Sequence, residues 1–117
     1  MAQTIESFPG WDGSINRLEA EELLRGQPVG SYVLRKGDKE TDAIATQLSS
    51  SNNLPIQSYL CTVLESENRI ADILILESPK GWTIYRDNPD LSDSEYIYFA
   101  TPNKLLTHIH KLARKPI

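Results

Sequence analysis

Two apolar segments joined by a short polar turn constrain the fold of this chain more than any other feature. Residues 59–64 and 69–76 are rich in β-branched, aromatic and leucine side chains, and residues 66–68 between them read Ser-Glu-Asn. Such a pattern predicts an antiparallel hairpin. Shorter strands are expected at residues 31–35, 82–85 and 96–99. The chain is therefore expected to build its core around an antiparallel sheet.

A helix is expected before the sheet, at residues 17–25. Asn16 is a suitable N-cap, and Glu19 stands three residues later, where a capping box needs its acid. The apolar side chains that recur at helical spacing are those of Ala20, Leu23 and Leu24. Their spacing predicts one apolar stripe on this helix.

A second helix is expected after the sheet. Thr101 is its expected N-cap, and Pro102 lies in the first turn, where a missing N–H group costs nothing. The expected apolar stripe comprises Leu105, Ile109 and Leu112. The basic residues expected to complement the helix dipole before Pro116 ends the helix are Lys111, Arg114 and Lys115. Helix, antiparallel strands and helix, in this order, predict an α+β fold with a central antiparallel β-sheet flanked by two α-helices.

Two polar segments interrupt this pattern. Residues 36–57 contain a run of serines and asparagines, and we interpret them as a long loop with room for a short helix or strand around residues 43–48. Loops of this length in small domains are commonly functional or mobile. Residues 86–95 form a second, acidic loop. This loop would either close over a bound peptide as a lid or form a disordered surface insertion.

Size and charge exclude several classes of partner. The chain has 117 residues, the size of a single domain, and its formal charge of −4 argues against nonspecific nucleic-acid binding. No apolar run approaches the roughly 20 residues that a membrane helix needs. The single cysteine, Cys61, excludes an internal disulfide and fits a reducing compartment such as the cytoplasm.

The sequence offers no catalytic or metal-binding residues. Cys61 lies in the middle of an expected strand without a neighbouring base, so it is a poor nucleophile. His108 and His110 are two residues apart on an expected helix and cannot share one face as metal ligands. We therefore expect no catalytic residue, no metal site and no cofactor.

Four motifs, in this order, resemble the Src-homology-2 family. The first is WDGSINRLEAEELL at residues 11–24, which matches the family's aromatic residue, glycine and Arg-x-x-Ala-Glu-x-Leu-Leu. The others are GSYVLR at residues 30–35, GWTI at residues 81–84 and FATPNKLLTHI at residues 99–109. The resemblance implies a lead-in at residues 1–10, a phosphotyrosine-binding domain at residues 11–113 and a tail at residues 114–117.

The resemblance also implies a phosphate site at the end of the first strand. Arg35 would hold two phosphate oxygens with its planar guanidinium. Arg17, in the first turn of the first helix, would contact the phosphate and pack on the tyrosine ring. Further phosphate donors are expected from Lys36, Gly37, Lys39 and Thr41. Contacts to the ring or the peptide are expected from Leu74, Asp72 and Tyr85.

The chain departs from the family pattern at positions that bear on binding. Gly37 stands where the family usually has a serine, Asp72 where a histidine is common, and Leu74 where a lysine is common. A buried arginine can also be satisfied by a carboxylate, so a second interpretation of Arg35 is an ion pair with Asp72. By the same reasoning, Arg17 could be an ordinary exposed helix residue and Leu74 a plain core residue.

Two functions follow from these observations. The first is a monomeric, cytoplasmic module that recruits tyrosine-phosphorylated proteins and has no nucleic-acid or membrane partner. The divergence from the family would suit a bacterial effector that reads phosphotyrosine in a host cytosol. The alternative is a protein-interaction domain that keeps the fold and has lost phosphotyrosine binding. A small enzyme is disfavoured, because the chain offers no nucleophile–base pair.

Overall fold

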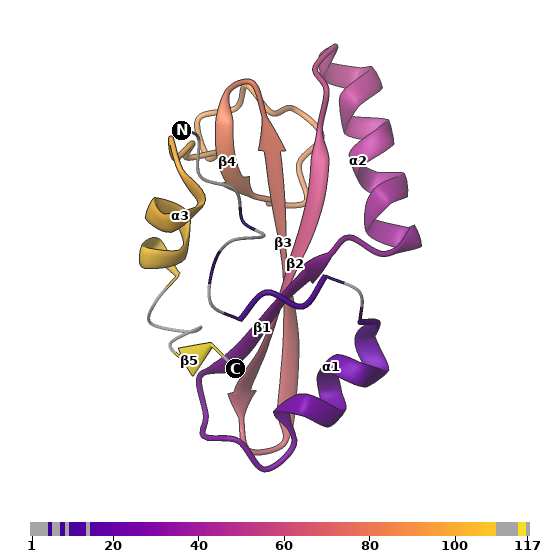
Figure 1. Cartoon of the computed structure of the whole chain (residues 1–117). Coiled ribbons are helices and arrows are strands. Elements are labelled where there is room, and N and C mark those ends of the chain that lie inside the picture. Colours follow the sequence, from indigo (N-terminus) through magenta and orange to yellow (C-terminus); the bar gives the residue numbers. More distant parts are fainter. Residues whose placement is uncertain (1–4, 6–7, 9, 14, 110–114, 117) are drawn as a thin grey trace.

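The computed structural model describes the chain apart from residues 1–4, 6–7, 9, 14, 110–114 and 117. It has an α+β fold, in which three helices pack against a four-stranded antiparallel sheet (Figure 1). The elements are α1 (Arg17–Leu24), β1 (Ser31–Lys36), α2 (Lys39–Asn52), β2 (Gln57–Ser66), β3 (Arg69–Ser78), β4 (Gly81–Ile84), α3 (Pro102–His108) and the short β5 (Lys115–Pro116). The two-residue β5 adds a fifth, parallel strand beside β1, so the order across the sheet is β4-β3-β2-β1-β5. The α+β prediction is confirmed.

The expected hairpin is the longest part of the sheet. Strands β2 and β3 are ten residues each and pair antiparallel, with Cys61 opposite Ile73. The register shifts between Leu64 and Ser66, next to the turn. On the other side of β2, strand β1 pairs antiparallel, and its outer edge is covered in turn by residues 10–12 and by β5. A sheet edge that is covered in this way is protected from pairing with other chains.

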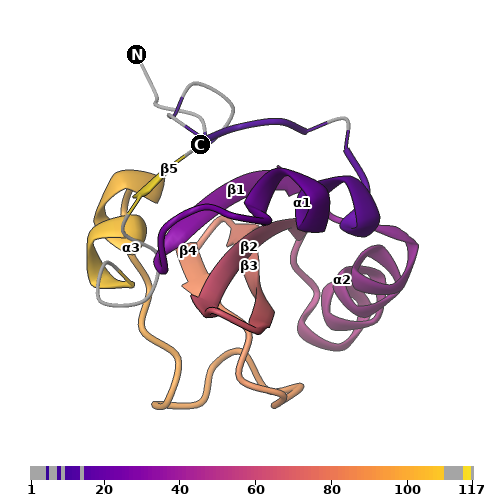
Figure 2. The same cartoon turned by 90° about the horizontal axis from the view of Figure 1, so that it is seen from below.

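The two faces of the sheet carry different helices. Figure 2 shows α3 on one side of the sheet and α2 on the other. The α3 side holds the larger apolar cluster, in which Leu105 and Ile109 pack among buried strand residues that include Tyr59 and Cys61. Burial, with a contribution from the charge of Asp72, raises the pKa of the Cys61 thiol to about 12. Cys61 therefore behaves as an inert core residue.

The capping box of α1 is confirmed, but its apolar stripe is narrower than expected. The Asn16 side chain accepts a hydrogen bond from the backbone N–H of Glu19, and the Glu19 side chain accepts one from the backbone N–H of Asn16. Ala20 and Leu24 are fully buried. Leu23 is 43% exposed, so its assignment to the buried stripe was wrong.

The interpretation of residues 36–57 as a long loop was wrong, because 14 of these residues form α2, which includes residues 43–48, where a short helix or strand was allowed for. Asp38 is the N-cap of α2, and Asn53 ends the helix in the left-handed conformation at φ 54°. The helix is held by tertiary packing, since Leu48 is buried in the second apolar cluster. The serines at residues 49–51 have modest helix propensity, but propensity is readily overridden by such packing.

The end of the chain also differs from expectation. Helix α3 ends at His108, so it does not continue to Pro116, and Lys115–Pro116 instead forms β5. The expected contributions of Lys111, Leu112 and Arg114 lie outside the described residues. The expected strand at residues 96–99 is reduced to one bridge, in which Phe99 and Trp82 exchange two backbone hydrogen bonds. None of the described helices is long and apolar enough to cross a membrane.

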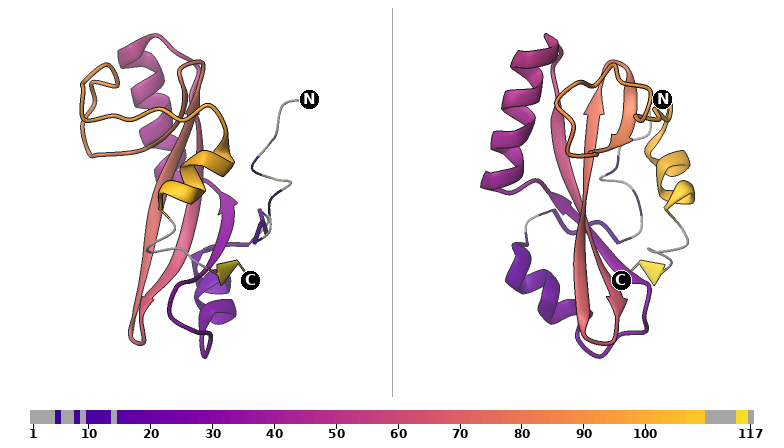
Figure 3. Two further views of the ribbon diagram at one scale, coloured as in Figure 1. Left: turned by 90° about the vertical axis from the view of Figure 1, so that its left-hand side faces the viewer. Right: turned by 180° about the vertical axis from the view of Figure 1, so that it is seen from behind.

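The acidic segment at residues 86–95 is docked on α2 and on the sheet, as the views in Figure 3 show. Leu91 is 1% exposed and packs in one cluster with Leu48 and Leu76. The Asn52 side chain fastens the segment to α2, because it donates to the carbonyl of Pro89 (2.9 Å) and accepts from the N–H of Leu91 (3.1 Å). The segment is therefore a packed part of the domain.

This docking makes Leu91 a stability determinant. Leu91→Ala should lower the free energy of unfolding by about 2–5 kcal/mol, because it removes buried methyl groups and leaves a cavity. Urea denaturation followed by circular dichroism measures this change. Ile97→Ala is the matched control, since Ile97 is 51% exposed and its truncation should change stability little. Equal midpoints for Leu91→Ala and the wild type would contradict the packing.

Candidate anion-binding site

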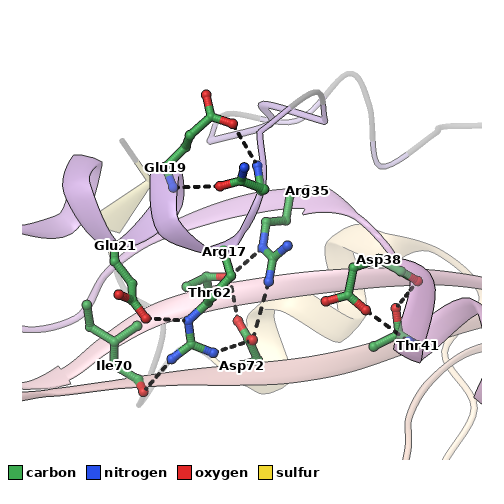
Figure 4. A network of polar contacts seen from close by, with 10 residues as sticks. Arg17, Glu19, Glu21, Arg35, Asp38, Thr41, Thr62, Ile70 and Asp72 are labelled. Carbon is green, nitrogen blue, oxygen red and sulfur yellow. Dashed lines mark hydrogen bonds and ion pairs between the residues drawn. The ribbon is translucent and has the colours of Figure 1, made fainter.

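Arg35 is a charged side chain in the interior of the domain. It lies near the end of β1, opposite Leu60 of β2, and is only 1% exposed. Its neighbours along β1 alternate between the faces of the sheet, which places Arg35 on the side of α1 and α2. There its Nε donates a hydrogen bond to the hydroxyl of Thr62 at 2.9 Å (Figure 4). A charge this deeply buried needs an anionic partner.

Asp72 supplies that partner. It lies on β3 directly opposite Thr62, and its Oδ1 accepts a hydrogen bond from the Thr62 hydroxyl at 2.6 Å. Its Oδ2 accepts from a terminal nitrogen of Arg35 at 3.3 Å. The structure thus has the ion pair that was the second interpretation of Arg35.

Arg17 approaches the same carboxylate from α1. One of its terminal nitrogens donates to Oδ2 of Asp72, and the other donates to the carbonyl of Ile70 at 3.2 Å. Its Nε pairs with Glu21 at 2.9 Å. Partial burial acts to lower the pKa of Arg17, but the charges and hydrogen bonds of Asp72 and Glu21 outweigh it and raise this pKa. Arg17 is therefore tied into the site.

The site is graded from a buried floor to an open mouth. The Arg35 side chain is 1% exposed, that of Asp72 is 24% exposed and that of Arg17 is 39% exposed. Two guanidinium groups from different elements meet at one carboxylate oxygen, as Figure 4 shows. Converging guanidinium groups are a common means of holding carboxylates and phosphates. The arrangement can therefore bind an oxyanion at the position of that oxygen.

The donors expected in the segment after Arg35 are mostly committed elsewhere. The N–H of Gly37 donates to the carbonyl of Ser58 at 3.2 Å. Both the N–H and the hydroxyl of Thr41 donate to Asp38, at 2.9 and 3.2 Å, as part of the α2 cap. In Figure 4 this capping pair lies to one side of the arginine network. The backbone N–H group of Gly37 and both Thr41 donors are thus used by the fold.

The two lysines of that segment are not part of the network among the described residues. Lys36 is exposed and follows Arg35 directly in β1, so it faces the opposite side of the sheet. Lys39 is exposed at the first position of α2. Neither side chain forms a hydrogen bond or an ion pair with another described residue in this structure. The structure therefore does not bring them to Arg35.

Gly37 has a steric reason to lack a side chain. A Cβ atom at this position would lie 1.9 Å from Oγ of Ser58, whose hydroxyl donates to Asp42 at 2.7 Å. The hydroxyl of Ser58 thus occupies the space that a serine at position 37 would need. Neither this role of Ser58 nor that of Thr62 was expected from the sequence, because both depend on which residues lie opposite each other in the sheet.

Leu74 and Tyr85 form an apolar wall next to the site. Leu74 lies two residues after Asp72 on β3, on the same face, and both Leu74 and Tyr85 pack at the margin of the second apolar cluster. The backbone N–H of Tyr85 donates to the carbonyl of Leu74 at 3.0 Å. Partial burial is the main cause of a raised pKa of the Tyr85 hydroxyl, and the nearby charge of Asp87 adds to it. Both side chains are partly exposed, so an aromatic ring could pack against them.

No cluster of three His, Cys, Asp or Glu side chains that could hold a metal ion occurs in the described part of the chain. A scan of protein-family models found no match to this sequence. A search of curated proteins likewise found no similar sequence. The resemblance to the Src-homology-2 family therefore depends on the four motifs alone.

Proposed function

We propose that this chain is a non-catalytic module that binds phosphotyrosine, with the phosphate held by Arg35 and Arg17 in place of the Asp72 carboxylate. The observation that carries this proposal is the meeting of both guanidinium groups at Oδ2 of Asp72. Arg17 also pairs with Glu21, but both arginines share the one Oδ2 atom of Asp72, whereas a phosphate monoester carries 1.5 to 2 negative charges at neutral pH and offers three acceptor oxygens.

The surroundings suit the rest of a phosphotyrosine side chain. Leu74 and Tyr85 give the ring an apolar surface beside the charged floor. Arg17 is 39% exposed and lies at the mouth, where its planar group can stack on an aromatic ring. The phosphate would then lie deepest, the ring above it, and the guanidinium of Arg17 nearest to solvent.

Binding must overcome the bond between Asp72 and the two arginines. Asp72 is tethered next to its partners, so it competes with an effective concentration in the range of about 1 mM or more. A ligand therefore has to offer stronger charge or more hydrogen bonds than the carboxylate does.

A second candidate function is favoured by the completeness of this network. Thr62, Asp72 and Arg35 satisfy one another, and Ser58 fills the space beside Gly37. A domain with this arrangement would serve as a protein-interaction scaffold that has lost phosphotyrosine binding. Its partners would contact other surfaces of the sheet or helices.

The proposed partners are tyrosine-phosphorylated proteins, which the module would bind as a monomer. The single buried thiol of Cys61 is compatible with a reducing cytosol. A bacterial effector acting in a host cytosol remains part of the proposal.

Titration of the wild-type chain with fluorescent peptides tests the proposed function. One peptide sequence should be used in three forms, with phosphotyrosine, phosphoserine or tyrosine at its centre. We expect saturable binding of the phosphotyrosine form only, because the ring must reach the apolar wall while the phosphate reaches Arg35. A dissociation constant of about 1 mM corresponds to a binding free energy of only about −4 kcal/mol. If no form of the peptide binds saturably up to that concentration, the second candidate function is favoured over the first.

A further inference from the structure

We infer that Asp72 is a charge-selective gate, which yields to a doubly charged phosphate monoester and excludes singly charged anions from the two arginines. This inference rests on the proposed function, and it concerns the selectivity of the same site. Asp72 accepts three hydrogen bonds, from Thr62, Arg35 and Arg17, with one negative charge. Any ligand that binds the two arginines must displace the Asp72 carboxylate from them.

The exchange favours only ligands with more charge. A monoanion that replaces Asp72 brings the same charge to the arginines, but it must also give up its translational freedom, which the tethered carboxylate has already lost. A dianion brings nearly twice the charge, and its attraction to two guanidinium groups is larger in a partly buried site than in water. The gate thus discriminates by charge before any contact with the tyrosine ring.

Asp72 is the more accessible partner of the buried ion pair, because its side chain is 24% exposed and that of Arg35 is 1% exposed. Asp72 is exposed when its main chain and side chain are taken together, and 24% of its side-chain surface is exposed. It lies on the part of β3 beyond the pairing with β4, which begins at Ile75 and Ile84. A rotation about the first side-chain dihedral of Asp72 would carry the carboxylate towards solvent. Arg35 is buried in the sheet and has no such route.

Thr62 keeps the arginine in position when the carboxylate leaves. Its hydroxyl donates to Asp72 and at the same time accepts from Nε of Arg35. The bond from Nε does not require Asp72, so the fork of Arg35 stays aimed at the mouth of the site. The hydroxyl hydrogen of Thr62 can then turn to an incoming phosphate oxygen.

The test compares the wild type with Asp72→Asn, which keeps the shape of the side chain and removes its charge. Each protein is titrated with one peptide that carries either phosphotyrosine, a dianion, or sulfotyrosine, a monoanion. We expect the wild type to bind only the phosphorylated form. Asp72→Asn should bind that form at least about tenfold more tightly, since the arginines are no longer blocked most of the time, and should also gain measurable sulfotyrosine binding.

Two controls separate charge from folding. Glu67→Gln makes the same change in net charge at an exposed position in the hairpin turn and should leave both affinities unchanged. Circular dichroism establishes that each variant is folded. If Asp72→Asn does not fold, the wild type alone still tests the gate, which is overturned if the wild type binds the sulfotyrosine peptide as tightly as the phosphotyrosine peptide.

The outcomes distinguish the gate from the proposed function. If the wild type binds phosphotyrosine and the neutral variant shows the same affinity and the same selectivity, the gate is overturned and the proposed function stands. If only the neutral variant binds, Asp72 blocks the site without yielding to the dianion, so both the gate and the proposed function are overturned and the wild-type chain belongs to the second candidate function. If neither protein binds either peptide, both the gate and the proposed function are overturned.

Discussion

Arg35→Ala is expected to abolish the binding of phosphotyrosine peptides. Truncation of one partner in a buried, hydrogen-bonded charge pair costs about 2–5 kcal/mol, which corresponds to a loss of affinity of about thirtyfold to several thousandfold. The effect should lie near the upper end because Arg35 is the floor of the site, with a side chain only 1% exposed, so little water can replace it. Isothermal titration calorimetry with a phosphotyrosine peptide measures the loss.

Two further variants show whether the loss is specific. Arg69→Ala removes the same charge from a side chain that is 75% exposed, and its affinity should match the wild type. Arg35→Met keeps most of the volume of the side chain and should lose binding as Arg35→Ala does. Full affinity in Arg35→Met would mean that the phosphate is held elsewhere.

Asp72→Ala is expected to destabilise the fold by about 3–5 kcal/mol. This is the usual consequence of removing one member of a buried ion pair, since the other is left without a counter-charge. Here the charge left behind belongs to Arg35, and a stability of about 5–15 kcal/mol is typical of a whole domain. Urea denaturation of the wild type and the variant gives the difference.

A double variant separates lost charge balance from lost packing. Arg35→Met combined with Asp72→Leu replaces both charges by apolar groups and should be more stable than Asp72→Ala, although Thr62 and Arg17 also lose their partner. If the double variant is instead less stable than Asp72→Ala, the ion pair is not the cause of the loss. Under the proposed function, the double variant should not bind phosphotyrosine, because it lacks Arg35.

The regular part of the fold was predictable because its signals are local. The hairpin follows from two apolar segments and a three-residue turn, and the start of α1 follows from the capping box of Asn16 and Glu19. The full length of α2 was missed because its sequence ends in serines and asparagines, while the contacts that stabilise it come from the sheet and from residues 86–95. Such contacts between distant segments leave no periodic pattern within the helix itself.

Only the charged residues of the site could be predicted from the sequence. Arg35, Arg17 and Asp72 stand out as charges in or next to apolar segments, and the pairing of Arg35 with Asp72 was one of two interpretations. The role of Thr62 depends on the cross-strand register, which places it opposite Asp72. The pairing of the two strands shifts near the hairpin turn, and no turn motif in the sequence predicts this shift.

The attachment of residues 86–95 to α2 has a consequence for the history of this chain. Leu91 packs in one cluster with Leu48 of α2, and Asn52 of α2 bonds to the carbonyl of Pro89 and to the N–H of Leu91, on either side of Asp90. Helix α2 and residues 86–95 therefore cover apolar side chains of each other. We therefore expect them to have been elaborated together, so that homologues which lack one also lack the other.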